Sequence, residues 1–156
     1  MKILSFVFLL FISFILPAGE LADRDKIVKA VWADFEKADF EQLNHTGSAY
    51  LGNQSRTSSG VWKLSLYYSA LSRVANKKET DPQYWTDLKN KVLRWSELDN
   101  GLSFAHMTYV HVLTDEAWMH RGGGYARDVP KEAWKPFKEK ISEARIYLEK
   151  YKHLSD

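Results

Sequence analysis

A glycine-rich block carries the most distinctive polar chemistry of this chain. Residues 117–126 read Ala-Trp-Met-His-Arg-Gly-Gly-Gly-Tyr-Ala and follow a long apolar stretch. Glycines adopt positive φ readily, so such a run ends a helix and turns the chain. Successive backbone N–H groups in that turn, together with the guanidinium of Arg121, would suit an anion. A phosphate-binding loop would also need a following Lys and Ser/Thr, and neither follows here.

The simpler interpretation of this block is structural, because glycine is the usual residue just past a helix end. In that interpretation Trp118 and Tyr125 pack into the core, and Arg121 pairs with a nearby carbonyl or carboxylate. If the protein binds a partner, we expect residues of this block and one upstream tryptophan to form the binding site. These binding residues are Trp85, Trp118, Arg121, Gly122, Gly124 and Tyr125.

The histidines before the block offer a second chemistry. His106 and His111 are five residues apart, so on a straight helix they point about 140° away from each other and cannot hold one metal. His111 and Asp115 are one turn apart and can pair, but no nucleophile stands beside them and the H-E-x-x-H zinc spacing is missing. We therefore predict no catalytic residue, no metal site and no cofactor. The alternative is a small hydrolase or metal-dependent enzyme using His111, Asp115, His120 and Arg121.

Apolar spacing predicts helices along nearly the whole chain after residue 22 and no convincing strand. The expected helices cover about 23–37, 39–50, 61–75, 81–95, 103–120 and 136–151. The fourth opens on Asp81-Pro82, an N-cap followed by proline. The fifth is apolar on all sides, which is typical of the central helix of a bundle. Because an interior proline disrupts a helix, a short turn over 130–134 should precede the last helix, which begins near Pro136. The sequence predicts an all-α fold, either a bundle or a tetratricopeptide-like stack.

The first 18 residues have the layout of a secretory signal peptide. A basic start is followed by an apolar run from Ile3 to Leu16 and then by Pro17-Ala18-Gly19. The run is shorter than the roughly 20 apolar residues that cross a bilayer. We expect residues 1–18 to be the signal peptide, cleaved after Ala18 or Ala22 unless retained as an anchor. Residues 23–156 would then form a single all-helical domain in the periplasm or outside the cell, without stable membrane insertion.

Composition narrows the class of protein further. The 22 basic and 20 acidic residues nearly balance, which argues against a nucleic-acid partner. The chain has no cysteine, which excludes a disulfide framework and a thiol nucleophile. Aromatic residues make up 14%, enough to build a core and to supply a binding groove for a sugar or a peptide. Their helical spacing favours the core, but the groove candidates are Trp62, Tyr67, Tyr68, Tyr84, Trp85 and Trp95.

The segment from Ala117 to Leu148 resembles an uncharacterised bacterial helical-domain family, a domain of unknown function. Members of that family carry an A-W-x-x-R-G-x-G-Y-A block followed by a Val, a Trp, a Phe and an Ala-Arg…Leu helix. The matching residues here are Ala117, Trp118, Arg121, Gly122, Gly124, Tyr125, Ala126, Val129, Trp134, Phe137, Ala144, Arg145 and Leu148. The resemblance implies a tetratricopeptide-like helical array without known catalytic residues. This chain has one helix after the block where similar chains continue, so an end face of the stack would lie open to a partner or to another copy.

Together these observations predict an exported module that binds or scaffolds a protein or peptide in the cell envelope.

Overall fold

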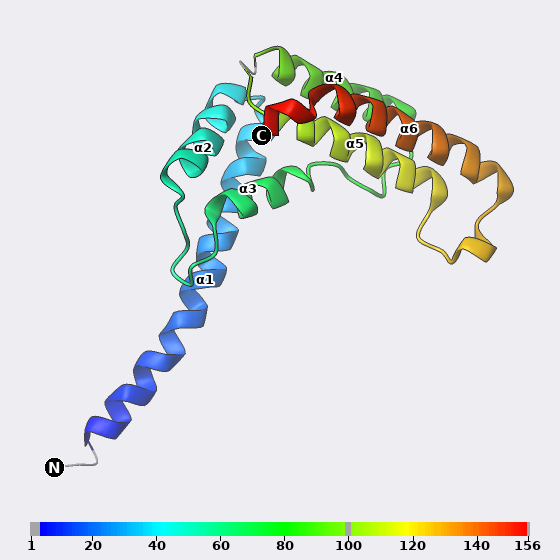
Figure 1. Ribbon diagram of the computed structural model, residues 1–156. Helices are drawn as coiled ribbons and strands as arrows, with labels where there is room; N and C mark the ends of the chain where they lie inside the picture. Colours follow the sequence, from blue (N-terminus) through cyan, green and yellow to red (C-terminus); the bar gives the residue numbers. More distant parts are fainter. Residues whose placement is uncertain (1–3, 99–100, 156) are drawn as a thin grey trace.

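A computed structural model of the protein describes the backbone of residues 4–98 and 101–155 and the side chains of residues 19–98 and 101–154 (Figure 1). The predicted signal peptide falls largely outside this range, since its first three residues and all its side chains are not described. Within the described part the chain is all-α, as predicted. The only extended pairing in that part is an isolated bridge between Arg56 and Trp62.

Six α-helices and three short 3-10 segments follow one another along the described chain. The α-helices are α1 (Leu4–Glu36), α2 (Phe40–Asn53), α3 (Lys63–Leu71), α4 (Pro82–Glu97), α5 (Phe104–Arg121) and α6 (Trp134–Tyr151). The 3-10 segments are Ala126–Asp128, Lys131–Ala133 and Lys152–Ser155. The first helix is longer than expected, because it runs without a break from the apolar N-terminal stretch into the domain (Figure 1).

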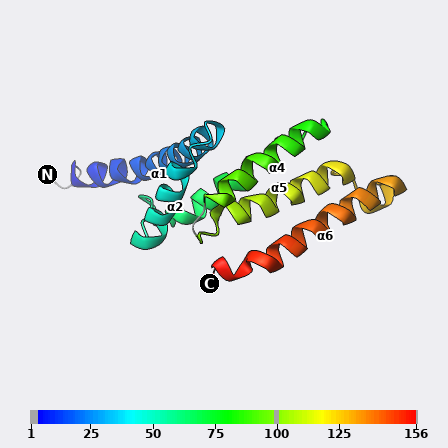
Figure 2. The same cartoon turned by 90° about the horizontal axis from the view of Figure 1, so that it is seen from above.

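The helices form two groups. In the first, α1 packs against α2 and α3, and in the second, α5 lies between α4 and α6. Figure 2 shows α4, α5 and α6 as a row, with the all-round apolar α5 in the middle as its sequence predicted. Its central place explains why ten of its residues are buried, against one in α6 at the edge of the row.

The structure confirms one predicted helix start in detail and places another two residues earlier than predicted. Asp81 caps α4 by accepting a hydrogen bond from the Gln83 backbone N–H at 2.9 Å, and Pro82 occupies the first turn. The short turn expected before the last helix is the 3-10 segment Lys131–Ala133. Helix α6 then begins at Trp134, two residues earlier than predicted. Pro136 thus lies in its first turn, where a missing N–H removes no helical hydrogen bond.

Aromatic side chains join the two groups of helices, and we call this contact the aromatic joint: Phe35, Phe40, Tyr67, Trp95 and Phe104. The Trp95 ring from α4 stacks on Phe40 from α2 at 5.7 Å between centroids, and its indole N–H donates to Asn44 Oδ1 at 2.8 Å. Tyr67 from α3 meets Phe104 from α5 edge-on at 5.3 Å. All five side chains are buried. One continuous core therefore runs through both groups.

The joint requires a glycine on α2. A Cβ placed on Gly47 would lie 2.6 Å from Cε2 of Phe104, whose ring is itself fully buried. We expect Gly47→Ala to lower the free energy of unfolding by about 1–3 kcal/mol, the usual cost of overpacking a core. Chemical denaturation measures this loss.

The same helix offers a matched control. Gly52 also lies in α2, and nothing stands within 4 Å of a Cβ added there. Gly52→Ala should be neutral or stabilise the fold by up to about 1 kcal/mol, since alanine favours helix. Equal stabilities for the two variants would contradict the close approach of α2 to Phe104.

Candidate functional site: an aromatic and arginine cluster at the hairpin tip

The sequence-predicted block lies at the outer end of the α5–α6 hairpin (Figure 2). There Trp118 and Arg121 from the last turn of α5 meet Trp134 and Phe137 from the first turn of α6. The Arg121 guanidinium carbon lies 4.9 Å from the Trp118 ring centroid and 5.2 Å from the Trp134 centroid. Phe137 closes the cluster edge-on to both indoles, at 5.3 and 5.9 Å. We call these four residues, with Tyr125, the hairpin tip.

Local backbone geometry explains how the tip is built. Helix α5 ends because Gly122 takes φ 76°, a conformation that favours glycine, while its N–H donates to the Trp118 carbonyl at 2.8 Å. Arg121 Nη1 then donates to the Gly122 carbonyl at 3.0 Å. The predicted glycine cap and the pairing of Arg121 with a carbonyl are thereby confirmed.

The expectation that Trp118 and Tyr125 pack into the core is wrong. Trp118 is 47% exposed and Tyr125 is 78% exposed, with the Arg127 guanidinium carbon 5.7 Å from the Tyr125 ring centroid. The reason is position: the block lies beyond the buried length of α5, where the start of α6 covers only one side of it. The tip therefore presents two large aromatic rings to its surroundings.

The three glycines of the block do not form an anion-binding nest. Of Gly122, Gly123 and Gly124, only Gly122 has a positive φ, and all three are exposed with no neighbour within 4 Å of an added Cβ. Arg121 is already engaged by a carbonyl and two indoles. Gly122 acts as the helix stop, and Gly124 belongs to the exposed turn that carries Tyr125.

Trp85, the remaining binding candidate, lies on α4 away from the hairpin tip, and the expectation that it binds a partner is wrong. Its side chain is 0% exposed in the core beneath α4, and its indole N–H donates to the Glu79 carbonyl at 3.0 Å. A fully covered indole offers no face to a partner. Tyr67 and Trp95 are likewise buried, and among the six groove candidates only Tyr84 lines a hollow of the surface, at the junction of α1 and α4.

The residues of the enzymatic alternative are not brought together. Asp115 is buried and paired with Lys77 Nζ at 2.9 Å, whereas Arg121 is held between indoles. His111 and Arg121 are ten residues apart on one helix, a rise of about 15 Å. Among the residues with described side chains, no three His, Asp or Glu form a group able to hold a metal ion. The geometry gives this alternative no support.

Sequence reasoning missed a buried ionic cluster on α5. The Glu116 carboxylate accepts from Lys89 Nζ of α4 at 2.8 and 3.0 Å, and Lys140 Nζ of α6 lies 3.5 Å from it. Only 9% of the Glu116 side chain is exposed. In the sequence, Lys89 lies 27 positions before Glu116 and Lys140 lies 24 positions after it, so no local spacing indicates the cluster. This cluster links α4, α5 and α6 through one shared carboxylate.

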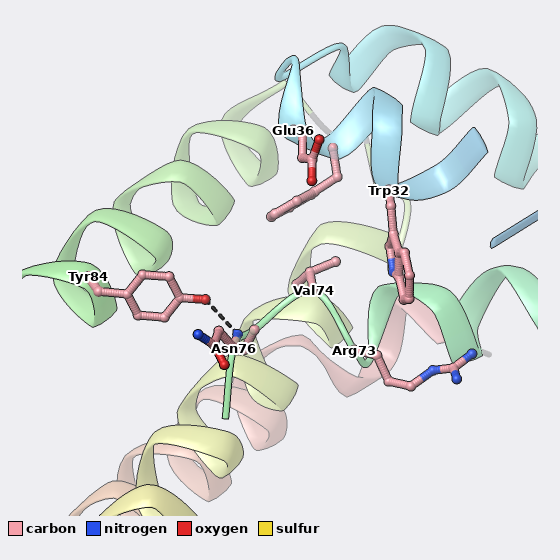
Figure 3. A pocket seen from close by; sticks show the side chains of 8 residues that line it. Trp32, Glu36, Arg73, Val74, Asn76 and Tyr84 are labelled. Carbon is pink, nitrogen blue, oxygen red and sulfur yellow. Dashed lines mark hydrogen bonds between the residues drawn. The ribbon is translucent and has the colours of Figure 1, made fainter. Parts of the chain in front are cut away.

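A shallow lateral groove lies at the junction of α1, α4 and the 72–80 segment (Figure 3). Two adjoining hollows of about 260 and 400 Å³ share Phe35, Glu36, Val74 and Tyr84. The Tyr84 hydroxyl accepts from the Asn76 backbone N–H at 2.6 Å, and Lys91 Nζ donates to the Glu36 carbonyl at 3.0 Å. These bonds fasten the groove walls to each other, so its polar groups serve first to join the two groups of helices.

The surroundings of a buried histidine predict that the fold loses stability in acid. His106 Nδ1 lies 2.9 Å from the Tyr147 hydroxyl, and the ring stacks on Tyr151 at 4.0 Å between centroids. Burial, aided by the positive charges of His153 and Lys150, lowers the pKa of His106 below 6.5. Burial also lowers the pKa of His111. The neutral rings are favoured in the folded state, so their stabilisation is complete above pH 6.5 and is lost as the pH falls below it.

We therefore expect the free energy of unfolding to fall between pH 7.5 and 5.5, with each histidine contributing at most about 1.4 kcal/mol per pH unit. His106→Phe keeps an aromatic ring against Tyr151 and should flatten this slope. His45→Phe is the control, because His45 is exposed on α2. Urea denaturation at several pH values measures the slopes, and an unchanged slope in His106→Phe would contradict the assignment.

Comparisons with protein-family models, with curated proteins and with solved structures found no match to this chain. The family resemblance of the 117–148 segment therefore stays a prediction. Over the residues with described side chains, no helix combines the length and the apolarity needed to cross a membrane.

Proposed function

We propose that this protein is an exported protein-binding module of the cell envelope and that the hairpin tip is its docking site. The observation that carries the proposal is the exposure of Trp118, whose ring together with that of Trp134 holds Arg121, and of Tyr125 in the turn that follows. Trp, Tyr and Arg are the residue types that dominate binding energy in protein interfaces. Export rests on the signal-peptide pattern of residues 1–18.

The internal order of the tip supports docking. Arg121 is held by the Gly122 carbonyl and by the rings of Trp118 and Trp134, so its long side chain has little rotamer freedom left to lose when a partner arrives. Phe137 holds both indoles in turn. Preorganised aromatic and arginine side chains bind at a lower entropic cost than mobile ones.

Charge indicates the chemistry of the partner. Residues 118–138, which form the tip and its base, contain five basic and two acidic residues. Arg127, Lys131, Lys135 and Lys138 are all exposed in this segment. A partner that presents an acidic, partly apolar segment would complement both the rings and the charge. Association should accordingly slow as the salt concentration rises.

Site-specific photo-crosslinking tests the proposal in the full chain. A photoreactive phenylalanine analogue in place of Tyr125, which is exposed, should capture a cell-envelope protein in the producing cells. The same analogue in place of Leu51, which is exposed on α2, is the control position. Capture of the same proteins from both positions, or of none from the tip, would contradict the proposal.

Affinity measurements with the purified partner complete the test. Trp118→Ala and Arg121→Ala should each weaken binding by about 30-fold, the size expected for a hot-spot side chain worth about 2 kcal/mol. Trp62→Ala is the matched control, since Trp62 is also exposed but lies at the start of α3. Unchanged affinity of both tip variants would show that the captured protein docks elsewhere.

A further inference from the structure

The edge helix α6 carries a second, separate surface. A hollow of about 490 Å³ lies between α5 and α6, and its floor is formed by Tyr109 and Tyr147. Glu139, Glu143, Ile146 and Lys150 border it on α6. We call these six residues the α6 face. Ile146 is 69% exposed, although it is a large apolar side chain.

The fold leaves this face without a partner inside the described chain. Helix α6 packs on α5 and is the last helix of the row in Figure 2. Ala144 is its only buried residue. An exposed isoleucine beside a tyrosine-floored hollow is the kind of apolar surface that a further helix covers in helical assemblies.

The charges on the face are arranged so that it complements itself. Glu143 precedes Ile146 by three residues and Lys150 follows it by four, which is one helical turn on either side. When two such helices cross antiparallel at Ile146, each Glu143 lies beside the Lys150 of the other copy. A two-fold axis through the crossing thus forms two opposite-charge pairs around one apolar centre, the pattern of a self-complementary interface.

We infer that the occupant of the α6 face is a second copy of this chain, bound antiparallel through α6 with Ile146 at the two-fold axis. The charges on the face fit this occupant, although the Lys150 Nζ also lies 4.9 Å from the Tyr151 ring centroid. Lys150 makes no ion pair among the described residues, and Glu143 pairs only with Lys140, at 3.0 Å, with 45% of its side chain still exposed. A helix of another protein would have to reproduce the reversed charge order that a second copy supplies by symmetry. The inference stands apart from the proposed function, because the hairpin tip is not part of this face.

The absence of cysteine from the chain allows a direct test. Helices packed 8–10 Å apart bring facing Cα atoms at a crossing to within about 3.5–5.5 Å of each other, a range that overlaps the Cα spacing of disulfides. The full chain carrying only Ile146→Cys should therefore form a covalent dimer on mild oxidation, seen on a non-reducing gel. Leu51→Cys is the matched control, since it replaces an exposed apolar residue on α2, away from the α6 face, and it should give no covalent dimer. Equal crosslinking of both variants, or none at Ile146→Cys, would overturn the inference.

A charge exchange then distinguishes this antiparallel pairing from other contacts at Ile146. In the Ile146→Cys background, Glu143→Lys should lower the rate of crosslinking about tenfold, because it sets two lysines side by side at each pair. Adding Lys150→Glu should restore the rate, since the pairs are rebuilt with reversed sign while the bond between Glu143 and Lys140 stays lost. Failure of the second change to restore crosslinking would overturn the antiparallel arrangement.

The oligomeric state without a crosslink gives an independent result. The full unmodified chain should run as a dimer in light scattering after size-exclusion chromatography, and Ile146→Asp should shift it to the monomer. Because Ile146 is mostly exposed, Ile146→Asp should leave the free energy of unfolding of the monomer unchanged. A monomeric unmodified chain, or a dimer that Ile146→Asp does not dissociate, would overturn the inference.

Discussion

Replacing Trp95 by alanine should lower the free energy of unfolding by about 3–5 kcal/mol, the usual cost of truncating a fully buried tryptophan. Its ring is 0% exposed, stacks on Phe40 and meets Phe35 edge-on at 6.4 Å. The substitution opens a cavity in the aromatic joint and leaves Asn44 without the indole donor. Urea denaturation followed by circular dichroism measures the loss.

The control is a tryptophan outside the core. Trp118→Ala removes a side chain of the same size that is 47% exposed, so we expect it to lower the free energy of unfolding by less than about 1 kcal/mol. The two variants therefore separate a tryptophan that stabilises the fold from one available for binding. A loss at Trp118 as large as the loss at Trp95 would contradict the exposed hairpin tip.

Neutralising the buried carboxylate should have the second large effect. Glu116→Gln keeps the shape of the side chain but leaves Lys89 and Lys140 close together without their shared anion. Removal of one partner from a buried ion pair costs about 3–5 kcal/mol, because the remaining charge stays in a poorly solvated place. We expect a loss of about 3 kcal/mol in urea denaturation, since both lysine side chains keep some exposure to water.

A double-mutant cycle tests the cause of this loss. Lys89→Met in the Glu116→Gln background should recover part of the stability, because it removes the unpaired charge. Glu149→Gln is the control at an exposed pair, Glu149 with Lys152, and should cost less than about 0.5 kcal/mol. If Glu116→Gln were as mild as Glu149→Gln, the cluster would not stabilise the row of helices.

The sequence was a good guide wherever a local pattern decides the structure. In the fourth helix, Trp85, Leu88, Val92 and Trp95 are spaced 3, 4 and 3 residues apart, which is the spacing of one helical face, and all four are buried. The Asp81-Pro82 start and the short turn before Pro136 followed from the hydrogen-bonding limits of proline. These features depend on neighbours within one or two turns, and such neighbours are visible in a sequence.

Long-range packing was where sequence reasoning failed. Trp118 continues the apolar pattern of α5, so its spacing indicated the core, yet the helix extends past the elements that cover its earlier turns. Trp85 was wrongly predicted as a binding candidate, although its spacing with Leu88, Val92 and Trp95 places it on the buried face of α4. The partners of Glu116 come from α4 and α6, so no spacing within its own helix indicated them.

The aromatic joint also bears on what a single cut in the backbone would do. Rings from both helical groups cover each other there, whereas Lys77 and Lys78 in the connecting segment are exposed. A protease that nicks the chain between them should therefore leave the two fragments associated, with unchanged size under native conditions and two bands after denaturation. The N-terminal fragment alone would expose three of the five rings and the C-terminal fragment the other two, so the fragments should refold only when mixed. Fragment complementation of this kind would turn the protein into a split reporter whose reassembly depends on Trp95.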